Sequence, residues 1–201
     1  MTGCTFVPVS DSSLSIQDIS VKGDAGEGDV NIQTLTSTGR TLAMYTYYAA
    51  DVFDDGMPAG WYDDDGLANV TFEHGQGLWV AAADSNTTLT FAGKVPTSDV
   101  VVVLQSGATA TANVMPTSVS IQDIVVTGDA GEGDVNIQTL TSTGRTLAMY
   151  TYYAEDVFDD GMPTGWYDDD GLADVTFEAG QGLWVAAGSS SATIRIPAPE
   201  L

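Results

Sequence analysis

The chain has 201 residues, of which 28 are acidic and five are basic, so its formal net charge at pH 7 is −23. A surface this acidic repels phosphate groups, which argues against binding to nucleic acid and to anionic membrane surfaces. We expect the charge to serve solubility, bound cations or a basic partner. Because 43% of the residues are hydrophobic, the chain can still bury a substantial core.

Short alternating segments rich in β-branched and aromatic residues predict strands along the chain. In the first half these segments are 15–21, 29–35, 41–48, 68–73, 78–81 and 87–91. Turns rich in glycine and aspartate separate them, and no segment sustains a helical period. This spacing predicts an all-β fold built as an antiparallel sandwich or a barrel-like sheet.

The chain contains a long internal repeat. Residues 15–82 recur at 120–187 with a constant offset of 105, and the two copies are identical at all but six of the 68 paired positions. We predict two tandem β-sandwich domains of near-identical sequence, spanning residues 1–98 and 106–201, joined by a connecting strand or linker at 99–105.

The connecting segment Asp99–Gln105 occurs only once. If each domain needs this strand, one domain lacks it, and the unpaired sheet edge would bind a strand of a neighbouring subunit or host assembly. Alternatively, the strand docks on one domain while the other domain covers its own edge. We take Val100 and Val102 as candidate interface residues.

Arg40 and Arg145 are the only basic residues present in both copies. Each follows Thr-Gly at a predicted hairpin tip. A surface arginine on an acidic protein typically pairs with a carboxylate, in a contact worth about 0–1 kcal/mol. We also consider both arginines as candidates for a subunit contact.

Two acidic loops in each copy carry carboxylates that suit calcium, a hard cation with oxygen ligands. The candidate ligands are Asp54, Asp55, Asp63, Asp64 and Asp65, with Asp159, Asp160, Asp168, Asp169 and Asp170 in the second copy. Their spacing does not match the usual calcium-binding loop. The alternative is that these aspartates are solvated turn residues.

Aromatic residues adjoin these loops. Trp61 and Tyr62, with Trp166 and Tyr167, lie between a glycine and an aspartate triplet. Such residues can stack on a sugar ring, although a tryptophan at a strand end more often fills the core. We expect the other two tryptophans, Trp79 and Trp184, to lie in the core.

No pattern indicates an enzyme. His74, the only histidine, is replaced by Ala179 in the second copy, so no histidine-based triad or metal site belongs to the repeating unit. Cys4, the only cysteine, aligns with Ala108 and is expected to be a small buried strand residue.

Residues 1–4 resemble the end of a lipoprotein signal, but no charged and apolar regions precede them. We therefore expect neither lipidation nor a signal peptide in the chain as written. The apolar run Val100–Leu104 has strand length and no run approaches about 18 residues, so no membrane span is expected.

The order of three motifs resembles a known group of proteins. Ser120–Ile124 comes first, then Asn136–Leu140, then Gly180–Val185, and the first copy has the same series. Together they resemble tandem β-domains in repetitive surface or virion-associated proteins of gut-type bacteria and their phages. The resemblance spans both copies, implies a surface or particle-building role, and transfers no site residues.

These observations favour a non-enzymatic structural protein, either a building block or a decoration or fibre subunit of an extracellular or virion assembly. Its expected partners are other copies of itself or a larger assembly. The alternative is a secreted bacterial adhesin or carbohydrate-binding module that binds a glycan through the acidic and aromatic loops, with calcium as a candidate cofactor.

Overall fold

The computed structural model describes residues 3–8, 13–23, 27–50, 52, 54, 56–83, 86–92, 94, 96–128, 132–154, 161–188 and 191–199. Its elements are strands and two short 3₁₀ turns, η1 (Ile16–Asp18) and η2 (Ile121–Asp123). The prediction of an all-β, antiparallel protein is confirmed. Over the described ranges, no helix is long and apolar enough to span a membrane.

The strands follow the order of the sequence repeat. Those of the first repeat are β1 (Gly3–Pro8), β2 (Ser13–Ser15), β3 (Ser20–Lys22), β4 (Glu27–Leu35), β5 (Thr41–Tyr48), β6 (Gly60–Asp63), β7 (Gly66–Leu67), β8 (Thr71–Glu73), β9 (Gly77–Ala82) and β10 (Thr88–Thr90). Next come β11 (Val100–Val103), β12 (Gly107–Ala112), β13 (Val119–Ser120), β14 (Val125–Thr127), β15 (Glu132–Leu140), β16 (Thr146–Tyr153), β17 (Gly165–Asp168), β18 (Gly171–Leu172), β19 (Thr176–Phe177), β20 (Gly182–Ala187) and β21 (Thr193–Ile196).

Each repeat contributes one six-stranded antiparallel sheet, with the orders β1-β9-β4-β5-β6-β7 and β12-β20-β15-β16-β17-β18. The registers are equivalent, since Cys4 pairs with Ala81 as Ala108 pairs with Ala186. The predicted strand position of Cys4 is thereby confirmed. The structure does not describe the burial of its side chain, so that part stays a prediction.

Smaller sheets accompany the two large ones. In the first repeat β2 pairs with β8 and β10 pairs with β3, and in the second repeat β13 pairs with β19. The fourth small sheet has three strands, in the order β11-β21-β14. Among the described residues, none of these sheets closes on itself into a barrel.

Alternation along the long strands places one face of each large sheet in a core. In β4, Val30 and Ile32 are fully buried, while Asn31 between them is only partly buried. The buried residues form two separate clusters, one from each repeat. Two-residue periodicity therefore generates the cores, as expected for antiparallel sheets.

A glutamine in each 3₁₀ turn links the turn to the large sheet. The Gln17 Nε2 donates to the carbonyl oxygens of Trp61 at 2.9 Å and Ala68 at 2.7 Å, and its Oε1 accepts from the Trp61 N–H at 3.2 Å. Gln122 makes the equivalent bonds to Trp166 and Ala173. The side chain thus adds a second donor to the Trp61 and Trp166 carbonyls, which also accept the N–H groups of Ala68 and Ala173, and it bonds two further backbone groups in each repeat.

The neighbouring glycine leaves room for this glutamine. A Cβ atom built on Gly60 would lie 2.7 Å from the Gln17 Oε1 and 2.9 Å from the Leu67 Cδ1. Both distances are too short for a side chain to be added without displacing Gln17 and Leu67. The Gly-Trp-Tyr-Asp sequence of β6 and β17 therefore begins with glycine for a steric reason.

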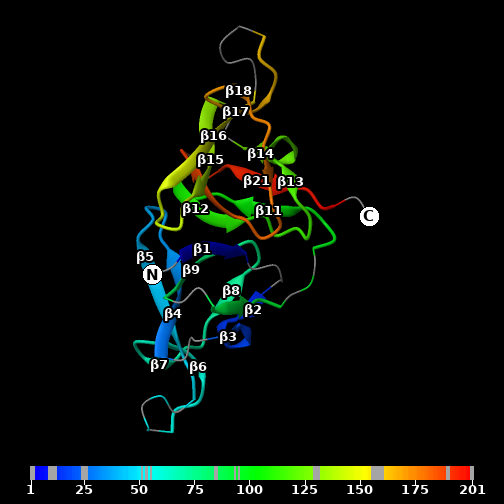
Figure 1. Ribbon diagram of the computed structural model, residues 1–201. Coiled ribbons are helices and arrows are strands. Elements are labelled where there is room, and N and C mark those ends of the chain that lie inside the picture. The colour runs from blue at the N-terminus through cyan, green and yellow to red at the C-terminus, as the bar shows by residue number, and fades with distance from the viewer. Residues whose placement is uncertain are drawn as a thin grey trace.

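The two repeats lie end to end, with β7 and β18 near opposite ends of the molecule (Figure 1). The edge strands β1 and β12 meet at the junction, where β1 also contacts β20 and β12 contacts β9. The Ala108 N–H donates to the Ser37 carbonyl at 2.9 Å, and the Thr111 hydroxyl donates to the Gly75 carbonyl at 2.8 Å. Sheet edges and turns of both repeats thus form the junction.

We expect Gln122→Ala to lower the free energy of unfolding by about 2–3 kcal/mol, because the Ala173 carbonyl and the Trp166 N–H lose their partner and the Trp166 carbonyl keeps only the Ala173 N–H. Urea denaturation followed by tryptophan fluorescence measures the change. The exposed Gln105 provides a control, since Gln105→Ala should cost less than about 0.5 kcal/mol. Equal effects of the two substitutions would contradict this role of Gln122.

Candidate interaction surfaces

The acidic loops form exposed turns. The carboxylate of Asp63 accepts the N–H of Asp65 at 3.0 Å, and that of Asp168 accepts the N–H of Asp170 at 2.9 Å. Each first aspartate thereby stabilises the turn that it begins. The middle residues Asp64 and Asp169 are also exposed.

No metal cluster is found in the described part of these loops. Within that part of the chain, no three histidine, cysteine, aspartate or glutamate side chains are grouped so that they could hold a metal ion. Asp54 is exposed, with a φ of 56°. Asp55, Asp159 and Asp160 lie outside the described residues, so calcium binding stays a prediction.

The four aromatic residues proposed to contact a glycan are buried, which corrects that interpretation. Trp61 and Trp166 are 1% and 0% exposed, and their indole N–H groups donate to the carbonyls of Ile19 and Ile124. Tyr62 and Tyr167 are also buried and donate to the carbonyls of Pro58 and Pro163. These rings fill the cores, so no sugar can stack on them.

The expectation that Trp79 and Trp184 lie in the core is wrong. Both are only partly buried, because the fully buried Leu78 and Leu183 beside them take the inward positions of β9 and β20. A Cβ built on Gly39 would lie 3.6 Å from the Trp184 ring, and one built on Gly144 would lie 3.6 Å from the Trp79 ring. Each tryptophan therefore packs against the hairpin tip of the other repeat.

A groove of about 490 Å³ lies at this junction. Six residues from each repeat line it, at positions related by the offset of 105, and none of them is charged. They are Gln33, Leu35, Thr38, Gly39, Thr41 and Trp79, with Gln138, Leu140, Thr143, Gly144, Thr146 and Trp184. The groove therefore offers indole rings, amides and hydroxyls from both sides.

Arg40 and Arg145 lie at the tips of the hairpins β4–β5 and β15–β16, as predicted. Both are exposed. The backbone N–H of Arg40 donates to the Thr36 hydroxyl, and that of Arg145 donates to the Thr141 hydroxyl, each at 3.1 Å. Among the described residues, neither arginine has a carboxylate within 4.0 Å. A role for them in a subunit contact stays a prediction.

The single segment between the repeats forms β11, which pairs antiparallel with β21 of the second repeat. Val100 and Val102 are 3% and 8% exposed and belong, with Leu104, to the second core. The choice of Val100 and Val102 as interface residues is therefore wrong. The outward residues of the strand are Val101 and Val103, which are 57% and 66% exposed.

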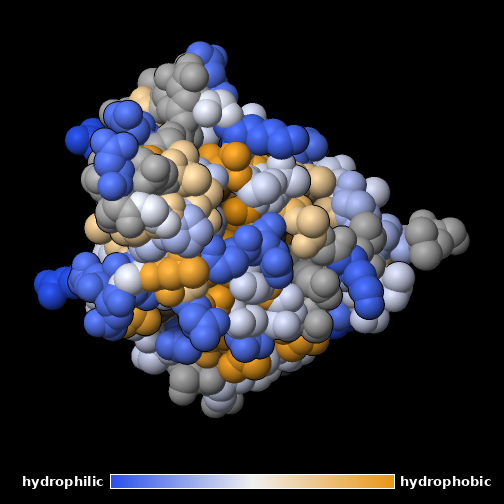
Figure 2. Space-filling model, turned by 90° about the horizontal axis from the view of Figure 1, so that it is seen from below, coloured by the Kyte–Doolittle hydropathy of each residue, from blue (hydrophilic) through white to orange (hydrophobic). Residues whose placement is uncertain are grey.

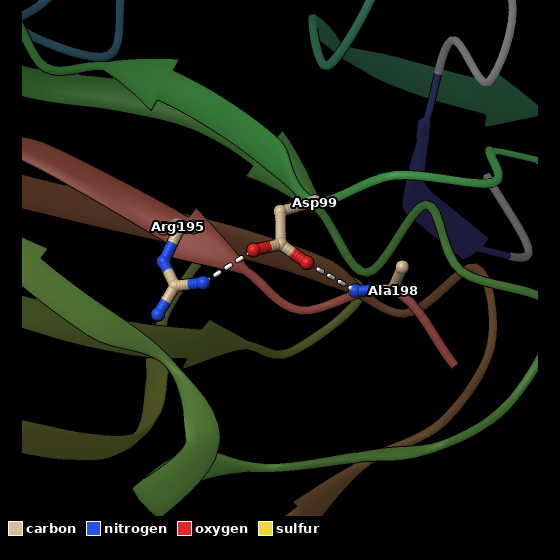
Figure 3. A network of polar contacts seen from close by, with 3 residues as sticks. All are labelled: Asp99, Arg195 and Ala198. Carbon is tan, nitrogen blue, oxygen red and sulfur yellow. Dashed lines mark hydrogen bonds and ion pairs between the residues drawn. The ribbon is translucent and has the colours of Figure 1, made fainter. Parts of the chain in front are cut away.

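An ion pair holds the beginning of this segment in place (Figure 3). The Asp99 carboxylate accepts from the Arg195 guanidinium and from the Ala198 N–H, the latter at 2.9 Å. The hydrogen bond from Ala198, followed by that from Arg195, lowers the pKa of Asp99 below its ordinary 3.8. The folded state thus favours the charged carboxylate.

The first repeat has no equivalent of β11 in the described residues. There β10 pairs with β3 alone, whereas its counterpart β21 lies between β11 and β14. Val21, Leu89 and Phe91 are only partly buried, but their counterparts Val126, Ile194 and Ile196 are buried. We call these three residues, with the edge of β10 that β3 does not pair, the open side of the first repeat.

Other large apolar side chains are also exposed, and most of them occur in both repeats. These are Leu42 and Leu147, Met44 and Met149, and Leu67 and Leu172. Figure 2, viewed from the end that carries the first repeat, shows hydrophobic residues in small areas between hydrophilic ones. Val101 and Val103 differ from these pairs because they lie in the segment that was not duplicated.

Sequence reasoning missed Val101 and Val103 as surface residues. Their signal was present, since four consecutive valines contain no polar position and are apolar on both faces of a strand. The partly buried positions of Trp79 and Trp184 had no comparable signal.

Comparison of the chain with models of protein families, with curated proteins and with solved structures gave no match.

We expect Arg195→Thr, which places the residue of the first repeat at this position, to loosen β11. The backbone amides of Val100–Val103 should then exchange hydrogen faster at pH 7, while Arg145→Thr should leave them unchanged. Because folding lowers the pKa of Asp99, the ion pair stabilises β11 fully above the ordinary value of 3.8. The difference between the variant and the wild type should shrink as the pH falls below that value, and a difference that does not depend on pH would contradict the ion pair.

Proposed function

We propose that the protein is a non-enzymatic structural protein made of two tandem sandwich-type β-domains. In this proposal it serves as a building block, or as a decoration or fibre subunit, of an extracellular or virion assembly. The observation that carries the proposal is the open side of the first repeat, where the second repeat has β11.

An unpaired strand edge beside partly buried apolar side chains is a site for strand addition. Backbone N–H and C=O groups at a free edge can pair with an extended segment, whose apolar side chains then cover the exposed part of the core. The second repeat contains this arrangement within one chain, since β11 supplies Val100 and Val102 to its core and Leu104 follows directly after the strand. The first repeat can obtain the same cover from another chain.

The charge of the chain is compatible with a subunit that remains dispersed until it is incorporated. A net charge of −23 makes free copies repel one another, and salt screens this repulsion. The resemblance to repetitive surface and virion-associated proteins also supports the proposal.

We expect the protein to self-associate in about 0.5 M NaCl, where the Debye length is on the order of 4 Å, and to dissociate at low salt. Sedimentation velocity over a wide range of concentrations measures this. A variant with residues 99–105 copied in front of Thr2, with threonine at the positions of Val101 and Val103, should cover the open side and remain monomeric. A wild-type protein that is monomeric under all these conditions would contradict assembly by self-association.

The groove between the repeats supports a second candidate function, the binding of a neutral glycan. Its volume of about 490 Å³ lies within the range of small-molecule sites, and its indole rings, amides and hydroxyls suit sugar rings and their hydroxyl groups. This groove replaces the buried Trp61 and Trp166 as the place where a glycan would bind.

A glycan array, probed with and without calcium, tests the second candidate. We expect binding to fall at least about tenfold in Gln33→Ala with Gln138→Ala, because the amides that bond to sugar hydroxyls are lost. The control substitutions Asp64→Ala and Asp169→Ala, in exposed loops outside the groove, should leave binding unchanged. Calcium-dependent binding that these aspartate substitutions abolish would instead assign the glycan to the acidic loops.

A further inference from the structure

We propose that the open side of the first repeat is closed by β11 of a second copy of the chain, so that copies join head to tail. This inference rests on the proposed function and names the partner. In the interface, β10 of one copy pairs with the free edge of β11 of the next copy. Val101 and Val103 of that β11 then cover Val21, Leu89 and Phe91.

The donor strand is apolar on both faces. Val100 and Val102 face the second core, while Val101 and Val103 point outward and are mostly exposed. A strand of this kind is typical of a sheet that is covered on both faces, whereas a strand with one solvated face usually alternates apolar and polar residues. In a single copy only one face of β11 is covered, so its outer face is available to a second core.

The donor strand also has a free edge. In the described residues β11 is the outermost strand of its sheet and pairs only with β21. A groove of about 440 Å³ separates Val101, Val102 and Val103 from residues 73–77 of the first repeat of the same chain. The backbone of β11 can therefore pair with one further strand while it remains part of the second repeat.

The acceptor is the equivalent of a site that β11 already occupies. The register of β3 with β10 matches that of β14 with β21, since Val21 pairs with Leu89 as Val126 pairs with Ile194. In the second repeat a valine-rich strand covers this pair of strands and buries Ile194 completely. The first repeat therefore has the geometry to accept a strand of the same composition.

A basic residue lies at the acceptor, although the equivalent strands of the second repeat also carry one, Arg195, which is paired with Asp99. Lys22 lies on β3 and pairs in register with Thr88 of β10, while its counterpart in the second repeat is the uncharged Thr127. One of the five basic residues of a strongly acidic chain thus lies at the acceptor. It lowers the repulsion that an approaching acidic copy meets there.

A donor and an acceptor on different parts of one chain form a heterologous contact. Such a contact uses two different surfaces and does not close on itself as a two-fold dimer does. Repetition of the contact would produce a linear or helical chain of copies, with one free donor and one free acceptor at its ends.

The test uses two variants, each with one side blocked. The donor-blocked variant carries Val101→Thr and Val103→Thr, which keep a β-branched side chain but remove the apolar contact. The acceptor-blocked variant carries the copied segment before Thr2, with threonine at the two outward positions. Leu42→Thr with Leu147→Thr is the control, because it removes equally exposed apolar side chains elsewhere.

Sedimentation velocity in about 0.5 M NaCl should show oligomers for the wild type and the control. Each blocked variant alone should be monomeric, because its association is weakened on the order of tenfold or more. The melting temperature of the donor-blocked variant should equal that of the wild type. An equimolar mixture of the two variants should form dimers and nothing larger, because one intact donor meets one intact acceptor.

Other outcomes separate the two proposals. If the wild type associates and the blocked variants associate equally well, the β10–β11 contact is overturned while a building-block function stands. If the mixture stays monomeric, the head-to-tail geometry is overturned. If the wild type never associates, both self-assembly and the contact are overturned.

Discussion

The cover that β11 places over the second core is the interaction on which the rest of the structure depends. A small sheet of two strands leaves part of its core residues exposed, as Val21, Leu89 and Phe91 show in the first repeat. A third strand that inserts Val100 and Val102, followed by Leu104, buries the equivalent residues in the second repeat. Full burial of such a side chain from full exposure stabilises the folded state by roughly 1.5–3 kcal/mol, and the partly buried side chains of the first repeat obtain only a part of this.

The junction between the repeats depends on positions that both copies share. Trp79 and Trp184 each lie beside the hairpin tip of the other repeat, at Gly144 and Gly39, whose positive φ values of 77° and 76° favour glycine. The groove between them is lined by equivalent residues from both sides. Duplication of one unit thus supplies both halves of a contact surface, as in a two-fold dimer whose subunits have been fused. The largest difference between the described parts of the two repeats is the single strand β11.

Much of the fold could be predicted from alternation and turn chemistry. The long strands β4, β5 and β9 coincide with apolar and polar alternation, and their turns coincide with glycine and aspartate. The role of Gln17 could not be predicted, because its partners Trp61 and Ala68 are distant in sequence and meet it only in the folded chain. The positions of the aromatic residues were partly predicted, since Trp61 is in the core and Trp79 is not.

The sequence by itself determined the all-β class, the repeat and the one segment that was not copied, because these follow from local periodicity and from direct comparison of residues. Only the tertiary structure decided which repeat holds β11 and which of its faces is buried. In a strand, neighbouring side chains point to opposite faces, so a shift of one residue exchanges inside and outside. Four consecutive valines give no local preference between the two registers, and the choice is made by pairing with β21 and by the ion pair of Asp99 with Arg195.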